Sequence, residues 1–495
     1  MRSLIIDSFV LEACLSAISA VVAVIVARKV PDPYLDEIFH IPQACRYYNG
    51  EYTWDPKITT PPGLYLVSLP IIRLAHWTLG ESCTVSVLRA VNLFGVLFAV
   101  PASVRLCAAT SNRDLPLLIQ LFPPLYFFGF LYYTDVWSTV FVLLAMSPAL
   151  APTGLLATKV PRYIRIPLTA FLSSAAVLMR QTNVVWICYA AALELLSALV
   201  YPAAKGKERA NDIYLLNSSR QVEDVSSIAD IFRAIVAAFV RTWTRIKPGR
   251  SKIRKALVAL SSYGFVAVAF SAFVFYNGGI ALGDKDNHTA GIHIPQIFYF
   301  TVFSCIISAP TTIPIFFSSL QKITSVRGLF TVTLAVPVVL FAIDRTTIAH
   351  PFLLADNRHY PFYIWRRIIN LTPNSRYWLA PLYIVATWLV FWVRLRSERV
   401  LSVILFFGAT AAVLVPSPLI ECRYFIVPYV VWRLRVAELD SVEEEHSSES
   451  QQQGVVMRRV EIAWSALINA VTLALFLLKS FEWPSEPGVR QRFMW

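Results

Sequence analysis

Long runs without a charged side chain recur along this chain, and they constrain its fold more than any other feature. Three of them cover 297–320, 328–343 and 400–420. A transmembrane helix needs roughly 20 mostly apolar residues. A soluble protein carries about 25% charged residues, whereas this chain carries 15%. We therefore predict an all-α polytopic membrane protein, one integral domain over 1–495 with about twelve to fourteen transmembrane helices.

The net charge of +13 has a topological explanation. In a soluble protein such a charge would suggest a nucleic-acid partner. Here the Lys and Arg residues lie in loops between apolar runs, where positive charge marks the cytosolic side, and we expect no nucleic-acid partner. The loop over 202–255 is strongly basic, and we place it in the cytosol. The loop over 438–458 is acidic and rich in Ser and Gln, and we expect it to be disordered.

The first apolar run, 4–27, is expected to remain as a helix with its short N-terminal flank in the cytosol. This orientation makes 31–84 the first lumenal loop. The apolar part of that loop, 64–79, is interrupted by proline and by charge, so we predict a helix along the membrane interface rather than across it. The same assignment sends the basic 202–255 loop to the cytosol, in agreement with its charge.

The first lumenal loop has the composition of a functional site. A connector between two membrane helices would be short and simply polar. This loop instead mixes carboxylates, an imidazole and aromatic groups just outside the membrane, where ionisable groups are costly to order without a function. The alternative is an ordered loop with solvated charges. The residues concerned are Asp36, Glu37, His40, Gln43, Trp54, Asp55 and Lys57.

Further polar groups on the lumenal side come from several other loops. They are Tyr133, Asp135, Arg180, Asp284, His288, Asp356, Arg358, His359, Glu421 and Arg423. A carboxylate that takes a proton from a hydroxyl, together with cations that stabilise a leaving phosphate, suits glycosyl transfer from a lipid phosphate sugar. A membrane transporter is the alternative of another class. It would carry such groups within its spans and show internal repeats.

Some of these residues have equally good structural interpretations. Arg180 and Arg423 fit topogenic or snorkelling charges as well as they fit phosphate ligands. Asp284 and His288 fit contacts to sugar hydroxyls and a solvated loop equally well. A metal site built from Asp284, His288 and His293 would have only a weak signal, and the chemistry does not need one, so we expect no metal.

Most of the seven cysteines lie inside apolar runs, where a cysteine acts as a small hydrophobic side chain. Their spacing matches no metal-binding pattern. Only Cys45 and Cys83 lie where a disulfide could form outside the membrane, and we expect them to stay unpaired.

Several sequence strings resemble those of one family, the endoplasmic-reticulum α-1,2-glucosyltransferases that add the last glucose to the lipid-linked oligosaccharide for protein N-glycosylation. The two longest lie in the first lumenal loop, Asp36–Gln43 (DEIFHIPQ) and Trp54–Tyr65 (WDPKITTPPGLY). Others follow in order along nearly the whole chain. They are Leu131–Asp135, Arg180–Asn183, Gly283–Lys285, His350–Tyr360, Glu421–Tyr424 and Arg492–Trp495.

The resemblance implies a GT-C-type fold with a helical first lumenal loop, in a multi-pass protein of the endoplasmic-reticulum membrane whose active site is lumenal. It implies dolichyl phosphate glucose as the donor, a diglucosylated dolichyl-diphosphate oligosaccharide as the acceptor, membrane lipid around both, and no cofactor. The β-linked donor and α-linked product imply inversion in a single displacement. A related mannosyl- or glucosyltransferase acting at another step is the alternative.

The resemblance also implies that the first lumenal loop carries the acidic catalytic residue, with Asp36 the first choice as general base and Glu37 the second. From the residues alone the two are nearly equal, and adjacent side chains point in different directions. For the donor phosphate we predict Arg358, His359, Arg180, Arg423 and Lys57. For the sugars and the acceptor we predict His40, Gln43, Trp54, Asp55, Tyr133, Asp135, Asp284, His288, Asp356 and Glu421.

Overall fold

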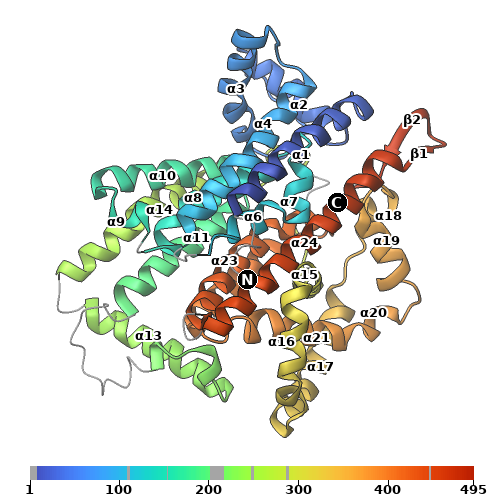
Figure 1. Ribbon diagram of the computed structural model, residues 1–495. Coiled ribbons are helices and arrows are strands. Elements are labelled where there is room, and N and C mark those ends of the chain that lie inside the picture. The colour runs from blue at the N-terminus through green and yellow to red at the C-terminus, as the bar shows by residue number, and fades with distance from the viewer. Residues whose placement is uncertain are drawn as a thin grey trace.

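The computed structural model describes residues 8–108, 112–152, 154–200, 217–246, 250–285, 289–444 and 448–495. Helices dominate these residues, and a two-stranded antiparallel hairpin follows the last helix (Figure 1). The helices of the N-terminal half are α1 (Ser8–Lys29), α2 (Glu37–Tyr48), α3 (Gly63–Leu79), α4 (Val85–Phe94), α5 (Val100–Cys107), α6 (Leu115–Gln120), α7 (Pro123–Phe128), α8 (Asp135–Leu150), α9 (Leu155–Thr158), α10 (Arg162–Met179), α11 (Asn183–Leu195) and α13 (Ile228–Ile246). Those that follow are α14 (Arg250–Asn277), α15 (Pro295–Ile307), α16 (Ala309–Thr324), α17 (Val326–Thr346), α18 (Pro351–Ala355), α19 (Tyr360–Ile364), α20 (Ser375–Trp378), α21 (Ala380–Trp388), α22 (Val400–Leu414), α23 (Ile426–Glu444) and α24 (Ser448–Leu478), and the strands are β1 (Ser480–Trp483) and β2 (Glu486–Arg492).

The predicted all-α polytopic membrane fold is confirmed. Within the described residues seven helices are long and apolar enough to cross a membrane, and an eighth is added if the bent pair α15 and α16 is one span. Three shorter apolar helices, α3, α8 and α22, fall below that length. The number of full-length spans is therefore smaller than the about twelve to fourteen predicted from hydropathy.

The segment 115–133 explains part of that difference. It has no charged residue and is long enough to cross a membrane, but it forms two short helices, α6 and α7, with a break just before Pro123 and Pro124. Proline removes a backbone donor and clashes with the preceding turn, so a helix stops there. Every residue from 114 to 140 is buried. The side chains of this apolar run therefore pack inside the bundle, and the run does not form a single span that faces lipid.

The predicted helical first loop is confirmed: α2 and α3 fill most of 31–84. Both pack together next to α4, at the end of the bundle drawn at the top of Figure 1. The helix over 64–79 is α3, with 17 residues. Its position along the membrane interface stays a prediction.

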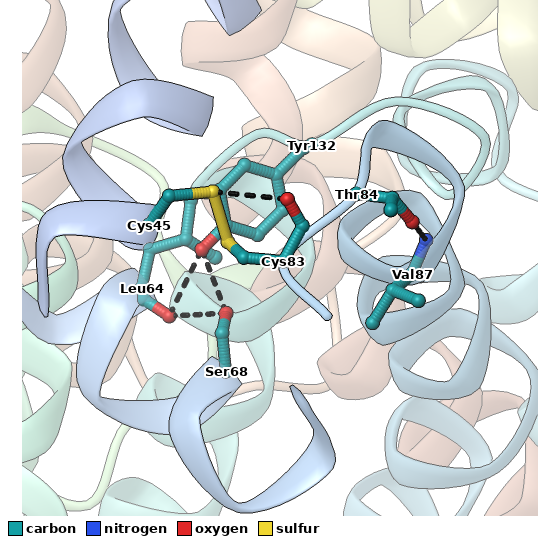
Figure 2. The surroundings of a disulfide bond; sticks show 7 residues. All are labelled: Cys45, Leu64, Ser68, Cys83, Thr84, Val87 and Tyr132. Carbon is teal, nitrogen blue, oxygen red and sulfur yellow. Dashed lines mark hydrogen bonds between the residues drawn. A yellow bond between two sulfur atoms is a disulfide. The ribbon is translucent and has the colours of Figure 1, made fainter. Parts of the chain in front are cut away.

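A disulfide joins Cys45 in α2 to Cys83 near the end of this loop, so the expectation that the two cysteines stay unpaired is wrong. The bond links α2 to the residue before the cap of α4, where the Thr84 hydroxyl accepts the Val87 N–H (Figure 2). In the same view the Tyr132 hydroxyl hydrogen-bonds with Ser68 of α3 at 2.7 Å. The loop is thus fixed covalently to α4 and by hydrogen bonds to the buried 131–135 segment.

Replacing Cys45 and Cys83 together by serine is expected to lower the free energy of unfolding. The bond closes a loop across a sequence separation of 38 residues. Opening such a loop gives conformational entropy back to the unfolded chain, which is typically worth about 2–4 kcal/mol. Thermal unfolding of the purified protein in detergent measures the change. The variant Cys14→Ser, at a free cysteine, is the control, and an unchanged unfolding midpoint in the double variant would contradict the assignment.

Two of the predicted loops contain helices. The acidic segment 438–458 is helical on both sides of 445–447, as parts of α23 and α24, and is not a disordered loop in the described residues. Glu and Gln favour helix. An ion pair from Arg435 to Glu438 lies within α23, and one from Arg394 to Asp440 binds this part of α23 to a neighbouring segment. Within the basic loop 202–255, the described residues include the helix α13, which places large apolar side chains on one exposed face; these are Ile228, Phe232, Ile235, Val236, Phe239 and Trp243.

Candidate active site

Most of the predicted site residues meet around one cavity of ≈ 1300 Å³. Its walls come from the first loop, from the ends of α8 and α11, from 352–359, from 421–428 and from the C-terminal hairpin and tail. Twelve of the seventeen residues proposed from sequence line it: Asp36, His40, Lys57, Tyr133, Asp135, Arg180, Asp284, Asp356, Arg358, His359, Glu421 and Arg423. Segments far apart in the chain are therefore assembled into one site.

Asp36 lies at the centre of this arrangement, in an ion pair with Arg423. The Arg423 Nη1 is 2.7 Å from Asp36 Oδ2, and the same guanidinium also pairs with Glu421. The Asp36 side chain remains 40% exposed. Its enclosed position would by itself raise its pKa, but the attraction of Arg423 lowers that pKa to about 2. Asp36 is thus an accessible carboxylate that is ionised at neutral pH.

Glu37 has the opposite environment and does not line the cavity. Its side chain is 0% exposed, and Arg89 of α4 binds it with both Nε (2.9 Å to Oε1) and Nη2 (2.5 Å to Oε2). The main-chain N–H groups of Tyr34 and Tyr132 donate to the same carboxylate at 2.9 and 2.7 Å. With these four hydrogen bonds, Glu37 ties the start of α2 to α4 and to the 131–135 segment.

The backbone just before Asp36 adopts an unusual conformation, which a hydrogen bond to Glu37 supports. Leu35 has a φ of +54°, in the left-handed region that a bulky residue rarely enters. Such a conformation costs on the order of 1–3 kcal/mol and persists where the surroundings enforce it. The hydrogen bond from the Tyr34 N–H to Glu37 Oε2 spans this residue. The fold therefore gives up some stability to place Asp36 at the cavity wall.

The other two arginines of the cavity are also oriented by carboxylates. Arg180 Nη2 lies 3.1 Å from Asp135 Oδ1. Arg358 forms a bidentate pair with Asp356, with Nε at 2.8 Å and Nη2 at 2.7 Å from its two oxygens. Asp135 and Asp356 were predicted as sugar-binding groups; both line the cavity, and both hold a guanidinium in place.

Asp284 lies at the cavity wall because the backbone at Gly283 packs closely against the first loop. Its N–H donates to the Pro56 carbonyl at 3.0 Å, and a Cβ on Gly283 would clash with that same oxygen. Only glycine fits there. The 282–284 turn is thereby docked on the first loop.

Four predicted residues lie away from the cavity, and one is outside the described residues. The four are Glu37, described above, together with Gln43, Trp54 and Asp55. These three form hydrogen bonds within the first loop, close to Lys57 in the sequence. Gln43 Nε2 donates to Thr53 O at 2.7 Å, and its Oε1 accepts the Asp55 N–H at 3.2 Å. Trp54 Nε1 donates to Ile58 O. His288 falls within 286–288 and lies outside the described residues.

The cavity also contains residues that were not predicted from the sequence. The two most notable are Trp483 in β1 and Trp495 in the tail that follows β2. The string Arg492–Trp495 was one of those that carried the family resemblance, so a signal existed, but hydropathy and charge could not assign it a position.

His40 lies in α2, one turn after Asp36, and lines the same cavity. Its side chain is 9% exposed, and its Nδ1 hydrogen-bonds with the Tyr65 hydroxyl at 2.7 Å. Burial disfavours the charged imidazolium and lowers the pKa of His40 to about 4. His40 is therefore neutral at pH 7.

This lowered pKa makes the stability of the protein depend on pH in a defined window. The unfolded chain binds a proton at His40 below about pH 6.5, whereas the folded protein binds it only near pH 4. The contribution of neutral His40 to the free energy of unfolding is complete above pH 6.5. It is lost as the pH falls toward 4, by on the order of 3 kcal/mol. Thermal unfolding between pH 7 and 4 measures it. The His40→Gln variant should lose this part of the dependence of the unfolding midpoint on pH, and the exposed His76→Gln control should keep it. The same pH dependence in both variants would contradict the assignment.

The sequence of this chain matches a known protein family. The model of the DIE2/ALG10 family matches residues 30–434. The chain belongs to the DIE2/ALG10 family. Proteins of Homo sapiens and Yarrowia lipolytica, each named Dol-P-Glc:Glc(2)Man(9)GlcNAc(2)-PP-Dol alpha-1,2-glucosyltransferase, are both 34% identical to this chain. The human alignment covers 97% of this chain and 97% of the relative, and the Yarrowia lipolytica alignment covers 94% and 93%.

A relative with the same name, from Arabidopsis thaliana, is 33% identical over 96% of this chain and 97% of its own length. Among solved structures, the archaeal oligosaccharyltransferase AglB from Archaeoglobus fulgidus aligns with a TM-score of 0.42 and 12% identity, over 94% of this chain and 56% of that chain. This chain thus spans little more than half of that larger protein. The membership in the DIE2/ALG10 family rests on the sequence relatives.

Proposed function

We propose that this protein is a GT-C-type glucosyltransferase that moves glucose from dolichyl phosphate glucose to the 2-hydroxyl of the outer glucose of a diglucosylated dolichyl-diphosphate oligosaccharide. The names of its relatives state this reaction type and both substrates. The geometric observation that carries the proposal is one ionised, accessible carboxylate, Asp36, in a cavity that also holds the guanidinium groups of Arg180, Arg358 and Arg423.

In the proposed step Asp36 acts as the general base. The acceptor hydroxyl oxygen attacks the anomeric carbon of the donor glucose, and its proton passes to the Asp36 carboxylate. The bond from that carbon to the phosphate oxygen breaks, and its electron pair leaves with dolichyl phosphate. Attack from the face opposite the phosphate converts the β-linked donor into an α-linked product.

The cations of the cavity are assigned to the phosphate. Guanidinium groups bind phosphate oxygens in a bidentate manner and stabilise charge that grows as the bond breaks. Arg423 is suited to this role because it touches Asp36 directly. When the phosphate accepts hydrogen bonds from Arg423, the attraction of Arg423 for Asp36 weakens. The pKa of Asp36 then rises, and the carboxylate becomes a stronger base. We assign Glu37 a positioning role only.

The disulfide supports a lumenal active site in the endoplasmic-reticulum membrane. Disulfides persist in the oxidising lumen and are rare in the cytosol, and Cys45–Cys83 lies in the loop that carries Asp36. The arginine-rich segment 344–376 contributes Asp356 and Arg358 to the same cavity as Asp36, which supports its expected position on the lumenal side.

Transfer by the purified protein in detergent tests the proposal. The assay supplies labelled dolichyl phosphate glucose with lipid-linked oligosaccharides that carry no, one or two glucoses. We expect transfer to the diglucosylated acceptor alone, with a product that an α-1,2-specific glucosidase releases. Transfer from dolichyl phosphate mannose, or preference for an acceptor with fewer glucoses, would contradict the proposal and favour a related transferase acting at another step.

A further inference from the structure

The C-terminal tail returns from the hairpin to the cavity and pairs with the segment that holds Arg358. The Met494 N–H donates to the Arg358 carbonyl at 2.9 Å, and the Tyr360 N–H donates to the Met494 carbonyl at 3.1 Å. The main-chain oxygen of Trp495 lies 3.0 Å from His359 Nδ1. The tail therefore forms a short parallel pairing along one wall of the site.

Arg492 fixes this tail to two other parts of the protein. Its buried guanidinium donates to the carbonyls of Phe476, at the end of α24, and Lys29, at the end of α1, each at 2.8 Å. Tyr34, two residues before Asp36, donates its hydroxyl proton to the Arg492 carbonyl at 2.8 Å. The tail is thus held to the same stretch of backbone that positions Asp36.

The hairpin contacts Arg358 through two further side chains. The Arg358 guanidinium lies over the Trp483 ring, 4.5 Å from its centroid. The Trp483 Nε1–H donates to Asn357 Oδ1 at 2.8 Å, which holds the ring, and Arg358 Nη1 donates to Gln491 Oε1 at 3.1 Å. Together with the bidentate Asp356 contact, these bonds engage three of the five N–H donors of the guanidinium.

We propose that the C-terminal hairpin sets the affinity of the cavity for the lipid phosphate by clamping Arg358, with Trp483 and Gln491 as positioning residues. The inference rests on the proposed function for the identity of the anion. A guanidinium that is already fixed loses less conformational entropy when it binds phosphate than one that is free to rotate. The aromatic face also stabilises the cation without consuming its remaining donors.

Direct binding measurements test this proposal without turnover. Purified full-length protein in detergent is titrated with dolichyl phosphate, and with dolichol as the probe that lacks the phosphate. The Trp483→Leu variant is expected to bind dolichyl phosphate about tenfold more weakly, the effect of losing one partly desolvated cation–π contact. Its binding of dolichol should be unchanged. The exposed Trp378→Leu variant is the matched control.

The conservative variant Trp483→Phe separates positioning from packing. It keeps an aromatic face for Arg358 and loses the hydrogen bond to Asn357, so we expect affinity within about threefold of the wild type. Gln491→Leu, which removes the other contact, should weaken binding of dolichyl phosphate and not of dolichol. Unchanged affinity in Trp483→Leu, or an equal loss for both lipids, would overturn the proposal.

The binding and transfer assays together keep the two proposals apart. Wild-type protein that binds dolichyl phosphate through this clamp but transfers no glucose would disprove the proposed function and leave the clamp in place. Wild-type protein that transfers glucose, with the Trp483→Leu variant showing the same Michaelis constant for the donor, would disprove the clamp alone.

Discussion

Replacing Asp36 by asparagine is expected to lower kcat for glucosyl transfer by about 100- to 10,000-fold, the usual contribution of a general base. The amide has the shape of the carboxylate and can still accept a hydrogen bond from Arg423 Nη1, now 2.7 Å from Asp36 Oδ2. It cannot take a proton from the acceptor hydroxyl. The fold should therefore survive while the chemical step is lost. Single-turnover transfer with purified protein measures the effect.

Asp32→Asn is the matched control, because Asp32 is an exposed carboxylate in the same segment and does not line the cavity. Its activity is expected to stay within about twofold of the wild type, as for a surface change away from special features. Full activity of Asp36→Asn would remove Asp36 as the base.

Replacing Glu37 by glutamine is expected to destabilise the protein rather than to stop its chemistry selectively. The change leaves the buried Arg89 guanidinium without its carboxylate partner, and breaking a buried pair in this way typically costs about 3–5 kcal/mol. The unfolding midpoint in detergent and the yield of folded protein should both fall. Any protein that remains folded should keep its cavity, because Glu37 does not line it.

A double-mutant cycle sharpens this second prediction. Arg89→Gln should destabilise the protein to a similar degree, and the double variant should lose less than the sum of the two single changes, because contacting residues are not additive. Glu51→Gln, at an exposed glutamate of the same loop, is the control and should be neutral. A stable but inactive Glu37→Gln protein would contradict the positioning role and restore Glu37 as a catalytic candidate.

The contrast between Asp36 and Glu37 shows what the sequence could and could not decide. Both are carboxylates after the first span, and chemistry alone left them nearly equal. The structure differs between the two because Arg89, a residue in another helix, binds Glu37, whereas Asp36 pairs with Arg423. Long-range pairing of this kind leaves no local pattern in the sequence.

Composition and loop position predicted much of the site, even in so apolar a chain. Ionisable groups near a bilayer are costly, so those outside the spans concentrate at functional positions, and twelve of the proposed residues share the cavity. Arg180 and Arg423 could not be separated from topogenic charges by sequence. In the structure both line the cavity, and each pairs with a carboxylate of the cavity wall.

The errors have identifiable physical causes. A charge-free run such as 115–133 has the same composition whether it faces lipid or the interior of a bundle. The segment 438–458 looked disordered by composition, but its residues favour helix and its acids find arginine partners. The pairing of the C-terminal tail with 358–360 and the Cys45–Cys83 bond depend on distant contacts, which neither hydropathy nor spacing encodes.

The most direct test of the account is a structure of the protein with a non-transferable analogue of dolichyl phosphate glucose. We expect the phosphate to accept hydrogen bonds from Arg423 and Arg358 at about 2.7–2.9 Å. The anomeric carbon should face a space, open to an acceptor hydroxyl, within about 3 Å of an Asp36 carboxylate oxygen. A phosphate bound away from these guanidinium groups, or an anomeric carbon shielded from Asp36, would contradict the central claim.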